Sequence, residues 1–512
     1  MSSNSDQVYD LLIIGGGING AGIARDASGR GFSVYLCEMN DFASGTSSNS
    51  TKLIHGGLRY LENYQFRLVQ KSLKEREVLL KMAPHIIKPM RFILPHSKEM
   101  RPAWLMRIGL AIYDHLGFRK ILPGTSRISF KNHENNPLKK SFKYGFEYSD
   151  CWVDDSRLVI LNLIDAQNKG ASVKNYTKVT GVQNSNEFWR VATHDSNTGE
   201  ENIIKAKTII NASGPWIDEV LNNSFNEKNS KNVRLVRGSH IIVNKLFEHD
   251  KSYICQNPDG RIFFMIPYED KYTLIGTTDI DHGEIVGNCE ISQEEKEYIC
   301  ESANNYLEND ISLKDIIWSY SGVRPLYDDG SNKAQEATRD YIISSKKQGS
   351  SLVINIFGGK ITTYRRLAET ILKSIEEFLG KKKPSWTERS FLPGGEMLVD
   401  GHNDLYQTLN ENYPFLSNET LHRLIRSYGL MTTNIFGDAD TIESLGIDFG
   451  SGLYEKEVKY LIEKEWARFS DDILYRRSKL GLTLPDEGLI KLNSYLDNYF
   501  HKNEKSARET AA

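Results

Sequence analysis

The chain has 512 residues and a formal net charge of -3, with 39% hydrophobic and 26% charged residues. This length has room for two or three domains, and the composition is that of an ordinary globular protein. The slightly negative charge excludes a broad positive field, so we expect no nucleic-acid partner. The five cysteines form no C-x-x-C pair. We therefore expect no disulfide framework and no metal site.

Residues 9–38 have the pattern of a strand, a glycine turn, a helix and a second strand. The glycines of the G-x-G-x-x-G motif are Gly15, Gly17 and Gly20. In a nucleotide-binding unit they permit a tight turn, close approach of a pyrophosphate, and close contact between helix and strand. Glu38 ends the second strand, where an acid binds a ribose hydroxyl, and this disfavours NADP.

The remainder of the chain distinguishes between NAD and FAD, which both use this motif. A nicotinamide enzyme would continue its parallel sheet directly, whereas here a segment rich in Ser, Thr and Gly follows at 47–69. Distant segments near 213–216 and 357–362 complete the dinucleotide-binding unit. This discontinuous layout favours FAD.

Amphipathic spacing predicts helices over 64–82, 101–120 and 154–170. Short strand-like runs within 233–280 predict a mostly antiparallel sheet that is distinct from the first domain. Residues 351–386 repeat the form strand, glycine turn, helix, and the chain beyond 392–396 is typical of a small helical domain. No apolar stretch is long enough to span a bilayer, which leaves attachment to one membrane face open.

One helical face of the segment 101–120 carries Trp104, Ile108, Ile112 and Leu116, and basic residues surround it. This is the form of an interfacial helix beside anionic lipid. A helix buried against its own domain has the same pattern, so both interpretations stay open. The helix expected after residue 364 is a weaker candidate for lipid contact, because acidic residues dilute its positive charge.

Ten segments in chain order carry a resemblance to one family: "DLLIIGGGINGAGIARDASGRG", "SSNSTKLIHGGLRYLE", "REVLLKMAPH", "GFEYSDCWVDDSRLV", "NASGPW", "RGSHIIV", "IGTTD", "YSGVRPL", "TRDY" and "FGGKITTYR". Together they closely resemble the FAD-dependent glycerol-3-phosphate dehydrogenases of bacterial respiratory chains. The glycine motif is shared by many flavoproteins, whereas "KLIHGGLRYLE", "GVRPL" and "FGGKITTYR" are specific. The similarity covers nearly the whole chain.

The resemblance implies an α/β fold with a Rossmann-like FAD-binding domain of the glutathione-reductase and D-amino-acid-oxidase type. It adds an antiparallel-sheet substrate domain and a C-terminal helical domain. The implied FAD-binding domain is assembled from 8–80, 141–225 and 326–385. The remaining ranges are a membrane-proximal substrate region at 81–140, the substrate sheet at 226–325 and the helical domain at 390–512.

The implied reaction oxidises sn-glycerol 3-phosphate to dihydroxyacetone phosphate, with a hydride passing from C2 to flavin N5. The resemblance further implies that electrons pass to ubiquinone and that the protein lies peripherally on the cytoplasmic face of the inner membrane. The oligomeric state stays open, with a homodimer as one option.

The resemblance also implies the site residues. Those assigned to FAD are Gly15, Gly17, Ile18, Asn19, Gly20, Glu38, Thr46, Ser47, Ser48, Lys52, Leu53, His55, Gly56, Gly57, Val179, Ser213, Gly214, Trp216, Gly359, Lys360 and Thr362. Those assigned to the substrate are Arg59, Tyr60, His240, Arg324, Arg339 and Lys360.

Catalysis is assigned to His55, Arg324 and Lys360. Arginine forks suit a phosphate dianion. The base that removes the C2 hydroxyl proton stays open between His55, His240 and Lys360. His55 is favoured, because the two glycines that follow it permit close approach to a flavin ring.

Other functions remain open at this stage. A soluble glycerol-3-phosphate oxidase would share the flavin and substrate motifs and pass electrons to oxygen. A flavin oxidase of amines or amino acids would need one carboxylate-binding arginine and no cationic cluster. A non-catalytic flavin-binding subunit would have no use for His55, Arg324 and Lys360 together.

Overall fold

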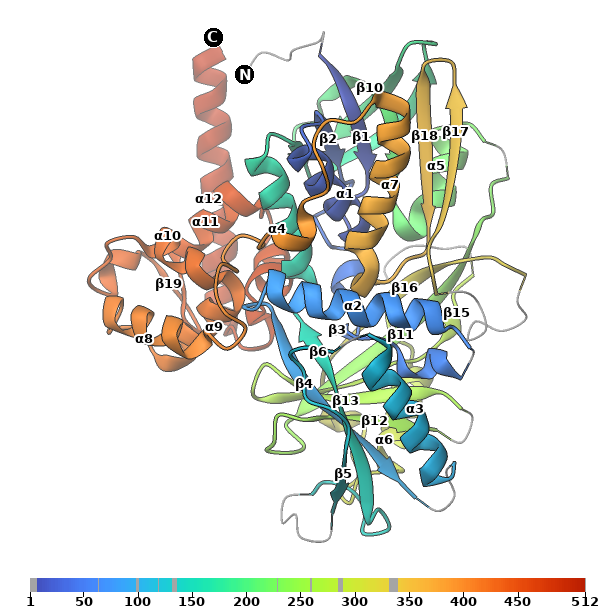
Figure 1. Ribbon diagram of the computed structural model, residues 1–512. Helices are drawn as coiled ribbons and strands as arrows, with labels where there is room; N and C mark the ends of the chain where they lie inside the picture. The colour runs from blue at the N-terminus through green and yellow to red at the C-terminus, as the bar shows by residue number, and fades with distance from the viewer. Residues whose placement is uncertain are drawn as a thin grey trace.

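The computed structural model describes residues 7–511, apart from 63, 98–100, 118, 131–135, 228, 258–259, 284–288 and 331–338. Two large sheets lie one above the other in Figure 1, and a helical C-terminal domain lies beside the level at which they meet. Within the part of the chain that is described, no helix combines the length and the apolar character needed to cross a membrane.

The first sheet has a parallel centre in which the strands run in the order β18-β10-β1-β2-β7. These strands are β1 (Val8–Ile14), β2 (Val34–Cys37), β7 (Ser172–Lys174), β10 (Glu201–Asn211) and β18 (Ser351–Phe357). Antiparallel strands extend it, namely β17 (Ile342–Gln348), β8 (Thr177–Asn184) and β9 (Trp189–Asp195). The buried apolar runs of β1 and β10 are typical of strands inside a parallel sheet that is covered on both faces.

Three helices pack together on one face of this sheet (Figure 1): α1 (Ile18–Gly29), α4 (Asp155–Asn168) and α7 (Tyr364–Leu379). The apolar face of α7, which includes Leu367, Ile371 and Ile375, is fully buried in this core. The proposal of lipid contact by this helix is therefore wrong, because its apolar face covers the sheet. The short α5 (Ile217–Asn223) contacts the opposite side of the domain.

The second sheet has the order β15-β11-β14-β13-β12-β4-β6-β3, with β16 on β11 and β5 on β6. Its strands are β3 (Leu53–Ile54), β4 (Ile87–His96), β5 (Ser126–Ser129), β6 (Tyr144–Val153), β11 (Val233–Asn244), β12 (Ser252–Gln256), β13 (Ile262–Tyr268), β14 (Tyr272–Gly276), β15 (Ile280–Asp281) and β16 (Ile316–Tyr327). The expected antiparallel character holds except between β4 and β12, which are parallel. Because β6 pairs with β4, the range 141–225 contributes to both sheets.

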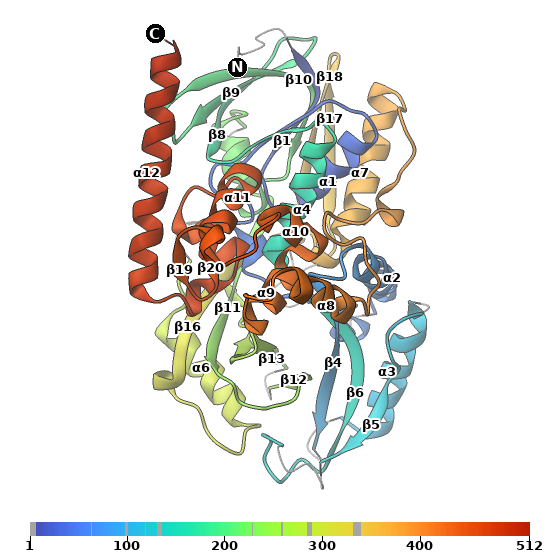
Figure 2. The same cartoon turned by 90° about the vertical axis from the view of Figure 1, so that its left-hand side faces the viewer.

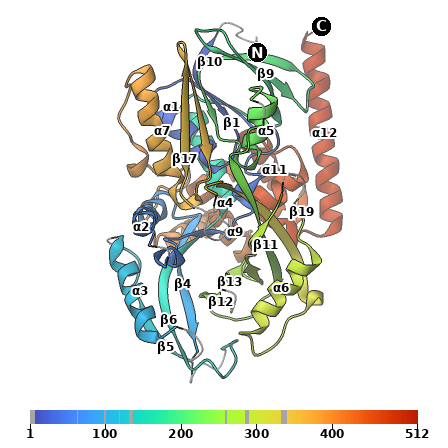
Figure 3. The ribbon, with the colours of Figure 1, turned by 90° about the vertical axis from the view of Figure 1, so that its right-hand side faces the viewer.

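Helices flank the second sheet. The helix α2 (Phe66–Met82) connects it to the first domain, α6 (Gln293–Asn304) packs on one part of its core, and α3 (Ala103–Leu116) packs on another. Figures 1 and 3 show α3 on the outer side of β4 and β6, remote from the C-terminal helix α12 (Asp486–Ala511).

The C-terminal domain has its own apolar core. Its other helices are α8 (His402–Asn412), α9 (Asn418–Tyr428), α10 (Thr432–Phe436) and α11 (Glu455–Glu465), and a small hairpin is formed by β19 (Asp448–Gly450) and β20 (Leu453–Tyr454). Figure 2 shows α11 against the first domain and α12 as a long helix along its side. A π-helical turn, Asp472–Arg477, follows α11.

Candidate active site

The turn between β1 and α1 forms the base of a nucleotide cradle. Gly15 has a positive φ of 111°, and a Cβ atom there would lie 2.6 Å from the carbonyl oxygen of Ala212. Only glycine fits this close approach of two strand ends. Glu38, at the end of β2, accepts a hydrogen bond from the amide of Gly16 at 2.7 Å. Burial raises the pKa of Glu38, and the charge of Asp41 adds to that rise.

A cavity of about 540 Å³, here called the main cavity, begins at this turn and continues to the second sheet. Among the residues assigned to FAD, its lining contains Gly15, Gly17, Ile18, Asn19, Glu38, Thr46, Ser47, Leu53, His55, Val179, Ser213, Gly214, Trp216, Gly359 and Lys360. Ser47 also accepts a hydrogen bond from the amide of Ile18 at 3.0 Å, which fixes the start of α1. The three distant segments predicted from the sequence thus meet at one end of the first sheet.

Five polar residues expected at the substrate line the same cavity: His55, Tyr60, Arg324, Arg339 and Lys360. The Lys360 amine donates a hydrogen bond to the His55 carbonyl oxygen at 2.7 Å and lies 5.1 Å from the centre of the Tyr60 ring. Gly57 has a φ of 85°, and a Cβ there would lie 2.2 Å from the Tyr60 ring. The "HGG" turn therefore packs closely against the segment that carries Lys360.

Asp279 joins the two arginines. Its carboxylate lies 2.7 Å from Arg324 and 3.7 Å from Arg339. The hydroxyl of Thr277 accepts a further hydrogen bond from Arg324 at 3.0 Å. The resemblance includes the "IGTTD" segment, but no motif or spacing within it distinguishes Asp279. The structure identifies it as the residue that orients both guanidinium groups.

Burial controls the ionisation of the two candidate bases that line the main cavity, whereas the third, His240, lies outside its lining. It lowers the pKa of Lys360 to about 7; Asp150 opposes this shift and Arg76 adds to it. Burial also lowers the pKa of His55 well below its ordinary value, with further lowering by Lys360 and Arg76. Both groups are therefore largely or partly unprotonated near neutral pH, and Lys360 is the stronger base of the two because its pKa is the higher.

A buried polar cluster supports the His55 turn from behind. The amide of Gly56 donates to the Tyr113 hydroxyl at 2.8 Å, and that hydroxyl donates to Asp150 at 2.8 Å. Arg76 pairs with Asp150 at 2.6 Å. Tyr113 belongs to α3, so this helix contacts the backbone next to His55. Sequence reasoning missed the cluster, because each member alone has no motif.

Eight predicted site residues lie outside the lining of the main cavity: Gly20, Ser48, Lys52, Gly56, Gly57, Arg59, His240 and Thr362. Ser48 and Lys52 border a neighbouring cavity, and the Lys52 amine pairs with the buried Asp155 at 2.9 Å. The hydroxyl of Thr362 lies 3.3 Å from both the amide and the carbonyl oxygen of His55, so Thr362 holds its backbone. His240 is buried, with its Nε2 atom 3.0 Å from the hydroxyl of Thr51 in the cavity wall.

Residues 10–365 match the family described as FAD dependent oxidoreductase. The chain belongs to this family. Residues 385–498 of this flavoenzyme match the C-terminal domain of alpha-glycerophosphate oxidase. The cradle fits FAD, because it joins a glycine turn, an acidic residue at the end of the second strand and a cavity that continues to the second sheet.

Relatives of this flavoenzyme extend over almost its whole length. D-erythritol 1-phosphate dehydrogenase of Brucella abortus is 46% identical, over 96% of this chain and 98% of its own. Aerobic glycerol-3-phosphate dehydrogenase of Escherichia coli is 45% identical, over 96% and 98% of the two chains. The X-ray structure of glycerol-3-phosphate dehydrogenase from Bacillus halodurans complexed with FAD superimposes with a TM-score of 0.72 at 26% identity, covering 96% of this chain and 95% of that one. These findings confirm the resemblance, the fold class and FAD as the cofactor.

Proposed function

We propose that this flavoenzyme oxidises sn-glycerol 3-phosphate to dihydroxyacetone phosphate. The observation that carries the proposal is the pair of arginines, Arg324 and Arg339, beside Lys360 and His55 in the cavity that fits FAD. Both guanidinium groups line this cavity, and guanidinium groups bind phosphate oxygens through paired hydrogen bonds, so Arg324 and Arg339 favour a phosphate ester as substrate. The names of the relatives support the same substrate class, a polyol phosphate.

Different residues of the cavity bind the phosphate, remove the hydroxyl proton and stabilise the developing alkoxide. When bound, FAD supplies the hydride acceptor at N5 of its ring. Arg324 and Arg339 hold the phosphate and so fix which carbon of the substrate faces the ring. Lys360 or His55 removes the C2 hydroxyl proton, and nearby cations stabilise the developing alkoxide. Gly56 and Gly57 let the turn that carries His55 pack against Tyr113 and Tyr60, because a Cβ atom at either position would lie within 2.6 Å of those side chains.

Anaerobic addition of sn-glycerol 3-phosphate to the FAD-loaded protein is expected to bleach the flavin absorbance. We also propose that a quinone is the electron acceptor. Reoxidation of the reduced flavin by a ubiquinone analogue should therefore be much faster than its reoxidation by oxygen. Rapid reoxidation by oxygen with peroxide release would favour the soluble oxidase. Absence of bleaching with this substrate, but bleaching by an amine or amino acid, would favour that class of oxidase.

A second candidate substrate is D-erythritol 1-phosphate, which the 46% identity to the Brucella enzyme favours. It offers the same phosphate and the same type of secondary alcohol with one more carbon. The two substrates compete for one site, so the ratio of their kcat/KM values in a single preparation decides between them. A higher value for the four-carbon ester would replace glycerol 3-phosphate in our proposal.

We further propose that the protein attaches to the cytoplasmic face of the inner membrane through α3. Leu110 and Tyr113 on its inner face are buried, whereas 64% of Trp104 and 49% of Ile108 are exposed. Ile112 is also exposed, while Leu116 packs partly against the domain. An exposed row of large apolar side chains with basic neighbours suits the interface of an anionic membrane. A homodimer remains a prediction.

Replacing Trp104 and Ile108 together by glutamate is expected to release the protein from vesicles that contain anionic lipid. Each large apolar side chain contributes about 1.5–3 kcal/mol to the free energy of membrane binding when it is buried in the lipid. The double substitution should therefore lower the membrane–water partition coefficient by at least about 100-fold. Co-sedimentation with the vesicles measures this. Ile203→Glu is the matched control, because 48% of Ile203 is exposed on the strand β10 of the other sheet. Equal binding by both variants would contradict attachment through α3.

A further inference from the structure

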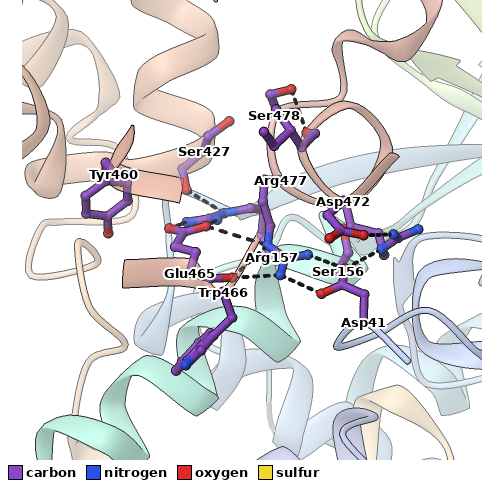
Figure 4. Close-up of polar contacts among 12 residues, drawn as sticks. Asp41, Ser156, Arg157, Ser427, Tyr460, Glu465, Trp466, Asp472, Arg477 and Ser478 are labelled. Atoms are coloured by element: carbon purple, nitrogen blue, oxygen red, sulfur yellow. Dashed lines mark hydrogen bonds and ion pairs between the residues drawn. The ribbon is translucent and has the colours of Figure 1, made fainter. Parts of the chain in front are cut away.

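The segment between Glu38 and Phe42 lies between the main cavity and the C-terminal domain. Glu38 lines the cavity, whereas Asp41 is buried and turns toward the π-helical turn Asp472–Arg477. Arg477 donates to both carboxylate oxygens of Asp41, at 2.6 and 2.8 Å, and Arg476 donates to it at 2.5 Å. Figure 4 shows this cluster. Two cations from one domain thus hold a residue that lies three positions after the ribose-binding acid.

The same turn also holds the neighbouring wall of the cavity. The hydroxyl of Tyr176 donates to Asp472 at 2.9 Å, and the Tyr176 amide donates to the carbonyl oxygen of Asn40 at 2.9 Å. The next amide, of Thr177, donates to the carbonyl oxygen of Glu38 at 2.7 Å, and Thr177 lines the cavity. The segment that carries Glu38 is therefore connected twice to the C-terminal domain, through Asp41 and through Tyr176.

The remaining contacts make this interface rigid. Arg477, which is fully buried, also donates to the carbonyl oxygen of Glu465 at 2.7 Å. The Glu465 carboxylate forms a buried ion pair with Arg157 of α4 (Figure 4). Phe42 packs edge-on against Trp466, with 5.1 Å between the ring centres. A buried network with satisfied partners specifies one arrangement of the groups it connects.

We propose that the C-terminal domain is part of the FAD site, and that Arg477 and Arg476 are positioning residues for its ribose-binding acid. Without them, Asp41 would be a buried carboxylate with no cation and only the 3.3 Å hydrogen bond from Asn175, and the segment would rearrange to return Asp41 to water. Glu38 would then leave the position at which it faces the cavity. The inference rests on the proposed role of Glu38 toward FAD, and it is independent of the substrate and the electron acceptor.

The test compares two buried arginines of the C-terminal domain. Arg423 forms a two-bond pair with Glu457, at 2.7 Å for each bond, inside that domain, so Arg423→Met is the matched control for Arg477→Met. The apoproteins are titrated with FAD, and flavin fluorescence gives Kd at a temperature at which circular dichroism shows all variants folded. We expect Arg477→Met to raise Kd for FAD at least tenfold and Arg423→Met to change it less than twofold. Equal effects of the two substitutions would overturn the inference.

Two further measurements keep the result interpretable. Glu38→Gln must also raise Kd for FAD, and if it does not, the proposed placement of FAD is wrong. If Glu38→Gln raises Kd for FAD but Arg477→Met does not, only the role of the C-terminal domain is overturned. If Arg477→Met does not fold, Arg476→Gln takes its place, because the Arg476 side chain is 17% exposed. Since coupling between sites is reciprocal, FAD should slow hydrogen exchange of the amides in 472–478 of the wild-type protein, and unchanged exchange would contradict the proposal.

Discussion

Replacing Lys360 by methionine is expected to lower kcat by about 10²–10⁴-fold, the usual contribution of a positioned general base. Burial holds the pKa of this amine at about 7, so it is protonated below that pH and free to accept a proton above it. In the wild-type enzyme kcat/KM should therefore rise with pH through about 7. The substitution should remove this rise along with most of the turnover.

Two variants distinguish between two roles of Lys360, as the base that accepts the proton or as a residue that only holds the backbone of His55. Lys360→Arg can still donate to the His55 carbonyl oxygen but cannot release its proton, so it should be as inactive as the methionine variant. His55→Ala should keep the rise in kcat/KM near pH 7 if Lys360 is the base. If Lys360→Arg retains turnover while His55→Ala loses it without a matching loss of product binding, His55 takes the proton instead.

Replacing Arg324 by glutamine is expected to lower kcat/KM for sn-glycerol 3-phosphate by about 10²–10³-fold. Removing one partner of a buried charge interaction typically costs about 2–5 kcal/mol, because the other charge is left without its partner. The effect should appear mainly as a higher KM, since the phosphate does not change charge during the reaction. Steady-state kinetics with a quinone analogue as acceptor measures both constants.

A substrate without the phosphate group is the control for this prediction. Activity with glycerol, which lacks the phosphate, should be low and nearly unchanged by Arg324→Gln. Arg234→Gln serves as the matched variant, because Arg234 lies on the adjacent strand β11 and pairs with Asp281 at 2.6 Å outside the main cavity. Similar losses with and without the phosphate would show that Arg324 maintains the site and does not bind the phosphate.

Much of the fold and part of the site could be predicted from the sequence, because the signals were local. The glycine turn, the strand that ends at Glu38 and the amphipathic helices each depend on residues within a few positions. The motif resemblance identified His55, Arg324 and Lys360, which the structure brings to one cavity. The resemblance implies a role for Lys52 toward FAD, yet its amine pairs with Asp155, because an amine buried there without a partner would be costly.

By itself, the sequence determined the glycine turn with its two strands, the positions of the amphipathic helices and the class of cofactor. The tertiary structure decided which faces of α3 and α7 are buried. Only the tertiary structure decided which distant residues act together. Lys360 meets the backbone of His55 across 305 positions, and Arg477 meets Asp41 across 436. Neither contact has a local pattern, because a lysine, an arginine or an aspartate in isolation has the signature of a solvated surface charge. Their buried positions arise when separate sheets and a helical domain pack together, and burial then makes each charge depend on its partner.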